Sequence, residues 1–225
     1  MVKAGIIIFP GTNRERDMKM ALEGAGFTTQ YIWHADASLP KGMDLVVLPG
    51  GFAHGDYLRP GAMAARSHII QDLTKHAGNG LPVFGVCNGF QVLLETGLLP
   101  GALRRNIHGR FVCKNVTLKI TPNHAPLLAH LVPGTHMTIP VAHHDGCYDI
   151  DHDGLRMLQD NGQIIAKYVG ENPNGSIDDI AGISSHKGRV VGMMPHPEDH
   201  VQPRQGNTDG ARLFQSFYQT LAGAA

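Results

Sequence analysis

This chain of 225 residues contains few cysteines and has no formal net charge. The three cysteines, Cys87, Cys113 and Cys147, are an odd number without close spacing, which argues against a disulfide framework and against a zinc site of paired cysteines. Lysine plus arginine number 19, as do aspartate plus glutamate, so the formal net charge is zero. Because nucleic acids and membrane surfaces attract basic proteins, neither is expected as the main partner.

Long apolar runs are also lacking. The first one, Ile6 to Phe9, has the length of a strand and stops at Pro10, so we expect neither a signal peptide nor a membrane span, and a cytoplasmic location is the default. Hydrophobic residues still make up 42% of the chain, enough for a core without disulfides or metals. No stretch resembles a linker, and we expect one domain over residues 1–225.

Hydrophobic patterning predicts an α/β fold. In the first hundred residues, strands are predicted at 2–9, 27–33, 44–48 and 82–86, and helices at 13–25, 61–77 and 88–96. After Pro100, strands are predicted at 110–120, 137–142 and 163–169, then a hairpin of 180–186 and 189–194 around Lys187-Gly188, and a closing helix at 208–221. We expect a flavodoxin-like, mostly parallel central sheet with helices on both faces, and antiparallel additions in the second half.

Cys87 stands between a predicted strand and a predicted helix, in the pattern Gly85-x-Cys87-x-Gly89. This pattern is the thiol counterpart of a nucleophile elbow, a sharp turn that exposes a reactive side chain above the sheet, and glycines relieve the crowding there. The helix start would direct free N–H groups at the sulfur and favour the nucleophilic thiolate. The alternative is a small, buried, apolar cysteine, and a catalytic role requires a base nearby.

The segment Pro195-His196-Pro197-Glu198 supplies a candidate base. The two prolines favour an extended chain, in which residues two apart point the same way. Glu198 would then orient one nitrogen of His196 while the other faces Cys87, as in a catalytic triad. The alternatives are an ordinary loop histidine, or a zinc pair with His200, for which the prolines and the position of Glu198 are unfavourable.

A candidate oxyanion site follows the strand predicted at 44–48, which ends at Pro49-Gly50-Gly51-Phe52. Backbone N–H groups around Gly51 and Phe52, with that of Asn88, would stabilise a tetrahedral oxyanion. Pro-Gly-Gly by itself is a common turn, but here it is expected at the same sheet edge as Cys87.

Together, these motifs resemble the class I (triad) glutamine amidotransferases. The resemblance implies that Cys87 is the nucleophile, that His196 and Glu198 complete the triad, that Gly50 and Gly51 belong to the oxyanion strand, and that Gln91 contacts glutamine.

Longer motifs are similar to one branch of that family, the glutaminase subunits of phosphoribosylformylglycinamidine synthase. They occur in order over nearly the whole chain, at residues 9–13, 51–59, 85–91, 172–176 and 192–198. The branch usually has Ala-His-Gly-Glu-Gly where this chain has Ala142-His-His-Asp-Gly146. His143 is retained as a weaker pocket candidate, whereas His144 in place of glycine would restrict the backbone, and His144 and Asp145 are left out of the predicted site.

The resemblance implies that this chain hydrolyses glutamine through a Cys87 thioester and passes ammonia to a large synthetase subunit, usually joined by a small third subunit. The synthetase would use ATP and magnesium to convert formylglycinamide ribonucleotide to its amidine in purine synthesis, and this chain would hold no cofactor or metal. No P-loop pattern occurs in the sequence, which agrees with ATP binding by the synthetase subunit. The alternatives are the glutaminase of anthranilate or carbamoyl phosphate synthesis, and a non-catalytic, flavodoxin-like redox or chaperone protein with a sensor cysteine.

Overall fold

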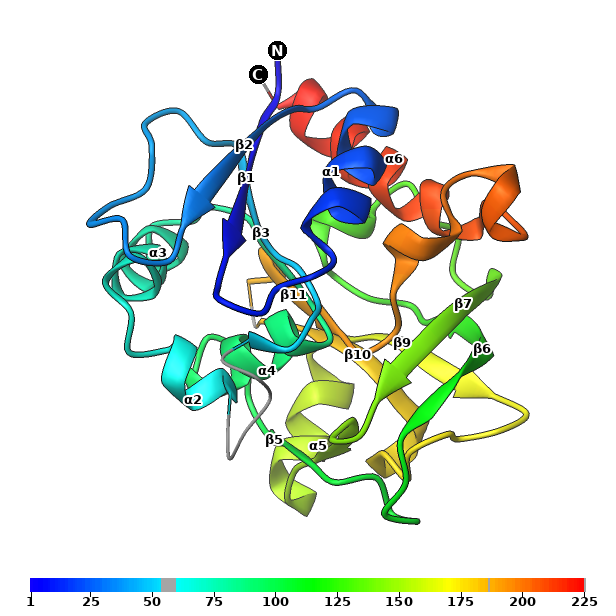
Figure 1. The fold of residues 1–225 in the computed structure, drawn as a ribbon. Helices are drawn as coiled ribbons and strands as arrows, with labels where there is room; N and C mark the ends of the chain where they lie inside the picture. The colour runs from blue at the N-terminus through cyan, green and yellow to red at the C-terminus, as the bar shows by residue number, and fades with distance from the viewer. Residues whose placement is uncertain (54–59, 186, 225) are drawn as a thin grey trace.

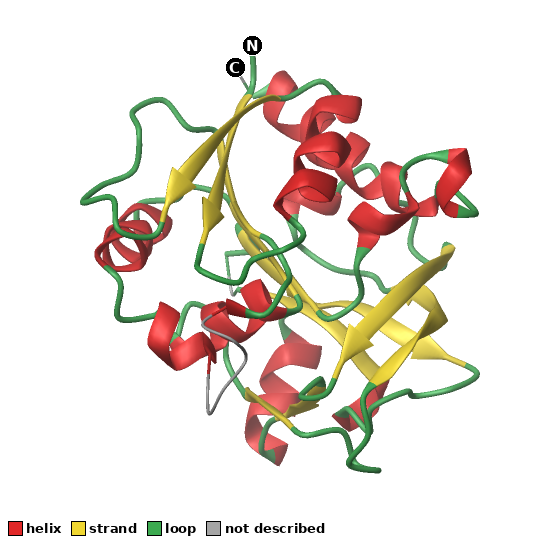
Figure 2. Cartoon of the chain, in the orientation of Figure 1, coloured by secondary structure: helices red, strands yellow, loops and turns green. Residues whose placement is uncertain are grey.

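A nine-stranded mixed sheet forms the centre of the molecule, with the strand order β2-β1-β3-β4-β11-β10-β9-β6-β7 (Figures 1 and 2). The ladders from β2 to β11 are parallel and those from β11 to β7 are antiparallel. The structure is a computed structural model that describes residues 1–53, 60–185 and 187–224. The strands of this sheet are β1 (Lys3–Ile8), β2 (Thr28–Trp33), β3 (Leu45–Leu48), β4 (Val83–Val86), β6 (Val112–Ile120), β7 (His136–His143), β9 (Ile164–Val169), β10 (Ile180–Ser184) and β11 (Val190–Met193). A separate small sheet pairs β5 (Ala102–Arg104) with β8 (Cys147–Asp149).

Helices cover both faces of the parallel half (Figure 1). The helices of the described residues are α1 (Glu15–Ala25), α2 (Pro60–Ala64), α3 (His68–Gly78), α4 (Asn88–Glu95), α5 (His152–Asp160) and α6 (Asp209–Gly223), of which α5 lies near the antiparallel half. Neighbouring residues of β4 point to opposite faces: Phe84 packs edge-to-face on Phe217 of α6, whereas a methyl group on Gly85 would lie 2.6 Å from Leu93 of α4. Thus α6 covers one face and α4 the other.

The central parallel strands are buried along their whole length. Every residue of β3, β4 and β11 is buried, and these strands consist mainly of valine, leucine and other apolar residues. A parallel strand covered by helices on both faces has no solvent side, so its sequence is a continuous apolar run without alternation. Because β4 pairs in parallel with both β3 and β11, the carboxyl ends of the three strands lie side by side at one edge of the sheet.

The predicted fold class is confirmed, with one clear error in a helix. Residues 61–77 were expected to form one helix, but they form α2 and α3, with a break at Ser67. Ser67 is extended and is the N-cap of α3, and its hydroxyl donates to the carbonyl of Ala64 at 2.8 Å. A serine that hydrogen-bonds to the nearby backbone competes with helix continuation, which explains the break.

Two strands and one α-helix of the described residues were not predicted. The three-residue strands β5 and β8 are too short for periodicity to reveal them. Helix α5 was missed although Asp151 is a recognisable N-cap, whose side chain accepts a hydrogen bond from Gly154 N at 2.7 Å. The strand predicted at 180–186 ends at Ser184, and His186 lies outside the described residues, as do residues 54–59 of the loop motif 51–59.

The helices that the structure describes are too short or too polar to cross a lipid bilayer. All three cysteines are free thiols, with Cys87 and Cys147 buried and Cys113 exposed.

Candidate active site

Cys87 occupies the turn between β4 and α4, as the elbow motif predicts. Its φ of 50° lies in the left-handed region, where a non-glycine residue is held at a cost of about 1–3 kcal/mol. The flanking glycines are required sterically. A methyl group on Gly89 would lie 1.9 Å from the carbonyl oxygen of Leu48, and one on Gly85 would lie 2.8 Å from the Gly89 backbone. The turn is therefore a strained, sterically defined feature that presents the thiol at the sheet edge.

The pairing of β4 with β11 brings His196 to Cys87. The two strands are parallel neighbours, with Met193 opposite Val86, so the residues that follow them emerge at the same edge. The Cys87 N–H donates to the carbonyl of Met193 at 2.9 Å, and His196 N donates to Pro140 O at 2.8 Å. Gly50 lies against both side chains: a methyl group there would be 2.5 Å from Cε1 of His196 and 3.4 Å from Cβ of Cys87.

The hydrogen bond predicted between His196 and Glu198 is present. Nδ1 of His196 lies 2.8 Å from Oε1 of Glu198, and the two side chains are only 3% and 0% exposed. Burial opposes protonation of His196, but the Glu198 carboxylate and the Cys87 sulfur outweigh it and raise the pKa of His196 well above 6.5. Because a carboxylate can only accept, Nδ1 carries a proton and Nε2 remains for the thiol. Buried Nε2 has no hydrogen-bond partner in the described part of the chain.

The segment after β3 lies beside the elbow, as expected for an oxyanion site. Gly51 has a φ of 144° and forms a bridge with Thr12, so the loop after β1 holds it in place. The Phe52 N–H donates to Gly11 O at 3.0 Å, so in this structure that amide is already engaged, and the Phe52 side chain is half-exposed. The predicted oxyanion donors are then best sought at Gly51 and at Asn88, whose N–H is at the start of α4 and lacks an intrahelical partner.

Gln91 joins the start of α4 to the loop after β7. Its Oε1 accepts a hydrogen bond from Asn88 Nδ2 at 2.8 Å, and its Nε2 donates to Asp145 O at 3.2 Å. The Cys87 Sγ lies 3.7 Å from the carbonyl oxygen of Ala142, which is in β7 just before this loop. A backbone carbonyl at the end of β7 therefore contacts the thiol, and one in the loop that follows contacts the side chain predicted to bind glutamine. No side-chain motif predicts either contact.

His143 lies in the site but is fully enclosed. Its Nδ1 is 3.1 Å from Asn106 Oδ1 and its Nε2 is 3.5 Å from Asn174 Nδ2. Burial lowers the pKa of His143 to about 4, and the charge of His196 acts in the same direction, so the ring is neutral at neutral pH. Both ring nitrogens face protein partners, which is not what a substrate-contacting histidine requires.

His144 does not strain the loop, contrary to the expectation. Among the described non-glycine residues, only Cys87, Asp178 and Asp179 have a positive φ, so His144 needs no glycine conformation. Its ring is partly exposed and its Nε2 lies 3.2 Å from Gly109 O. His144, where the family pattern has glycine, therefore makes a surface contact and has a backbone conformation that does not require glycine.

The described residues contain no group of three or more histidine, cysteine, aspartate or glutamate side chains placed to hold a metal ion. Nδ1 of His200 lies 2.7 Å from Thr138 O, and the 3-10 turn Pro197–His200 is not the α-helix that a zinc pair at this spacing uses.

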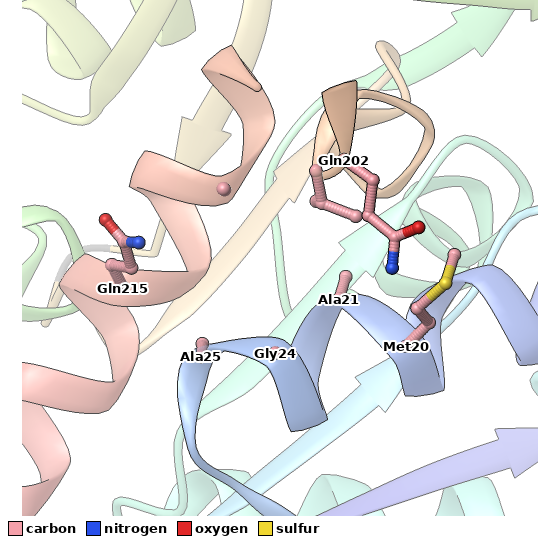
Figure 3. A pocket seen from close by; sticks show the side chains of 8 residues that line it. Met20, Ala21, Gly24, Ala25, Gln202 and Gln215 are labelled. Atoms are coloured by element: carbon pink, nitrogen blue, oxygen red, sulfur yellow. The ribbon is translucent and has the colours of Figure 1, made fainter. Parts of the chain in front are cut away.

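A small cavity of about 130 Å³ lies between α1, α6 and the segment that follows residue 200 (Figure 3). Figure 3 shows Met20 and Ala21 of α1 facing Gln202. The side chains that line it are aliphatic, thioether or amide groups without a titratable member, so this cavity offers no acid, base or nucleophile.

Comparison with known proteins gives consistent matches over the full chain. The family model of the CobB/CobQ-like glutamine amidotransferase domain matches residues 1–219. Two relatives named phosphoribosylformylglycinamidine synthase subunit PurQ are similar: that of Rhodospirillum rubrum is 50% identical, covering 98% of this chain and 100% of the relative, and that of Rhodopseudomonas palustris is 47% identical, covering 100% of both. A solved chain from the structure of PurLQS from Thermotoga maritima superposes with a TM-score of 0.89 at 40% identity, covering 98% of this chain and 99% of that one.

Proposed function

Because this chain belongs to the family of CobB/CobQ-like glutamine amidotransferases, we propose that it is the glutaminase subunit of a phosphoribosylformylglycinamidine synthase. The observation that carries the proposal is the position of Cys87, on a strained elbow beside a buried His196 that is bonded to Glu198. A nucleophile, a base and a carboxylate that orients the base are the groups that acyl transfer from an amide requires.

The first half of the reaction forms a thioester. The Cys87 thiolate attacks the side-chain amide carbon of glutamine, and the oxyanion that develops is stabilised by N–H groups at Gly51 and Asn88. The imidazolium of His196 donates the Nε2 proton to the departing nitrogen as the C–N bond breaks, and ammonia leaves. The raised pKa of His196 keeps that proton available at neutral pH.

The second half releases glutamate. Neutral His196 takes a proton from water, which attacks the thioester carbon; the C–S bond breaks and the imidazolium–thiolate pair is restored. Glu198 keeps its hydrogen bond to Nδ1 in both halves, so Nε2 faces the reacting atoms throughout. Gln91 and the loop after β7, to which it is hydrogen-bonded, would contact the substrate.

Ammonia would pass to a large synthetase subunit, with a small third subunit in the complex. The synthetase would hold ATP and magnesium and carry out the ribonucleotide chemistry, while this chain, as one glutaminase domain without its own cofactor, would make ammonia. We place the complex in the cytoplasm, where a nucleophilic thiol stays reduced.

Ammonium salt should replace glutamine in a complex that carries Cys87→Ala. The reconstituted complex should form no amidine from glutamine and ATP, yet should form it from high ammonium salt and ATP, and more readily at higher pH because free NH₃ is the nucleophile. Product formation with each nitrogen source, in wild-type and variant complexes, is the measurement. A variant that assembles but is not rescued would show that this chain does more than supply ammonia. Formation of anthranilate or carbamoyl phosphate by the wild-type complex would keep the family and overturn the pathway.

Glu198→Gln should weaken glutamine hydrolysis strongly without abolishing it. The amide can donate to Nδ1 and so favour the wrong tautomer of His196, and in other triads loss of the orienting carboxylate costs on the order of 10⁴-fold, less than loss of the nucleophile. Glutamate release by the complex is measured against Glu171→Gln, which changes an exposed glutamate in the same way. A loss at Glu198 as complete as that of Cys87→Ala, in a folded protein, would mean that Glu198 takes part more directly.

A further inference from the structure

Two buried asparagines hold the loop after β7 from both sides. Asn106, in the segment between β5 and β6, is 2% exposed, and Asn174, in the segment between β9 and β10, is 0% exposed. A buried amide must satisfy both its oxygen and its nitrogen, so its partners define its position tightly. Asn174 belongs to the motif at residues 172–176, to which the triad chemistry gives no role.

Asn106 bonds to the loop through both ends of its amide. Its Nδ2 donates to His143 O at 3.0 Å and to Arg110 O at 2.8 Å. Its Oδ1 accepts from Gly146 N at 3.1 Å and lies 3.1 Å from His143 Nδ1. Since Oδ1 can only accept, His143 carries its proton on Nδ1, which leaves Nε2 as an acceptor.

Asn174 holds the loop from the opposite side. Its Nδ2 donates to Gly146 O at 2.8 Å and lies 3.5 Å from His143 Nε2. Its Oδ1 is fixed by Ser176, which donates from its hydroxyl at 2.7 Å and from its N–H at 3.0 Å. The neutral His143 ring thus lies between the two amides, with a donor at Nδ1 and an acceptor at Nε2.

The His143 ring is packed closely against the backbone of the loop and has little room to move. A methyl group on Gly146 would lie 2.5 Å from Nδ1 of His143, so the ring and the backbone of the loop are in direct contact. The carbonyl of Ala142, at the end of β7 just before this loop, lies next to the Cys87 sulfur, and the carbonyl of Asp145, in the loop, accepts from Gln91. Any shift of the two asparagines or of the His143 ring would therefore move the groups that contact the thiol and the predicted glutamine site.

We propose that Asn106, His143 and Asn174 form a clamp of positioning residues, which sets the loop after β7 for glutamine to bind and react. The inference rests on the proposed glutaminase function. It assigns His143 a role through the loop, in place of direct contact with glutamine, and it gives the motif at residues 172–176 a function in the site.

Asn106→Asp and Asn174→Asp test the clamp, because each keeps the shape of the side chain and replaces its donor by an oxygen that repels a carbonyl. In the reconstituted complex, each should raise KM for glutamine and lower kcat, with kcat/KM down by roughly 10- to 100-fold, the size expected when a site is displaced by about 1 Å. Amidine formation from ammonium salt should stay at the wild-type rate, because the synthetase and the assembly are untouched. Asn115→Asp, the same change at an exposed asparagine of β6, is the matched control.

Wild-type kcat and KM for glutamine in both variants would overturn the clamp. So would an equal loss of glutamine- and ammonium-dependent activity, because that pattern indicates a structural role alone. If one variant does not fold, the other decides. Ser176→Ala is a third variant with the same two readouts, because it removes the hydroxyl that donates to Asn174 and accepts from Tyr148 N. Absence of glutaminase activity in the wild-type complex, by contrast, would refute the proposed function itself.

Discussion

Replacement of Cys87 by alanine should abolish glutamine hydrolysis. The sulfur is the atom that bonds to the substrate, and no other thiol can take its place, because Cys113 is an exposed residue of β6 and Cys147 is buried in the small sheet. Loss of the nucleophile from a triad costs on the order of 10⁶-fold in kcat, which leaves only the contribution of the oxyanion donors and substrate binding, about 10³–10⁴-fold over the uncatalysed reaction. Glutamate release by the reconstituted complex is the measurement.

Cys113→Ala and Cys147→Ala are the controls, and both should keep most of the activity. The alanine at residue 87 still has to adopt a φ of 50°, so near-ultraviolet circular dichroism and assembly with the synthetase should be checked in the same preparation. A glutamine analogue with a diazo ketone should label the wild-type chain and fail to label Cys87→Ala. Full hydrolysis by a folded Cys87→Ala complex would be incompatible with the assigned nucleophile.

His196→Ala should be nearly as damaging, because the nucleophile and the base act as one unit. The imidazolium both stabilises the thiolate and protonates the departing ammonia, and alanine removes both functions. Since the pKa of His196 is raised well above 6.5, wild-type activity should persist through neutral pH and decline at alkaline pH as the imidazolium loses its proton. The variant should lack that alkaline decline in its small remaining rate.

His136→Ala, at an exposed position of β7, is the matched control and should behave as wild type. The diazo ketone should still label Cys87 in His196→Ala, although more slowly, because the nucleophile is still present. Substantial hydrolysis by His196→Ala, with the wild-type pH profile, would assign the base to another residue.

The parts of the site that the sequence predicts are those encoded locally. Gly85-x-Cys87-x-Gly89 specifies its own turn, because a side chain at either glycine would meet the backbone or Leu93. His196 and Glu198 are two residues apart on a segment fixed by prolines, so their contact needs no knowledge of the rest of the chain. The central parallel strands β3 and β4 were equally recognisable, since continuous burial gives each a short apolar run.

The remaining parts depend on contacts between distant segments, which no local pattern encodes. Asn106 and Asn174 meet around His143 only because β6, β7 and β9 are neighbours in the sheet. The engagement of the Phe52 amide by Gly11 likewise depends on how the loops after β1 and β3 pair. The break at Ser67 was a local signal that the apolar pattern of residues 61–77 obscured.

Trapping the covalent intermediate tests the central claim most directly. The wild-type complex is mixed with glutamine carrying carbon-14 at its amide carbon, quenched in acid within the first turnover and digested, and the labelled peptide is sequenced. We expect the label on the peptide that contains Cys87, sensitive to hydroxylamine as a thioester is, and absent from Cys87→Ala. Label on any other residue, or rapid glutamate release in a single turnover without labelled Cys87, would contradict the account.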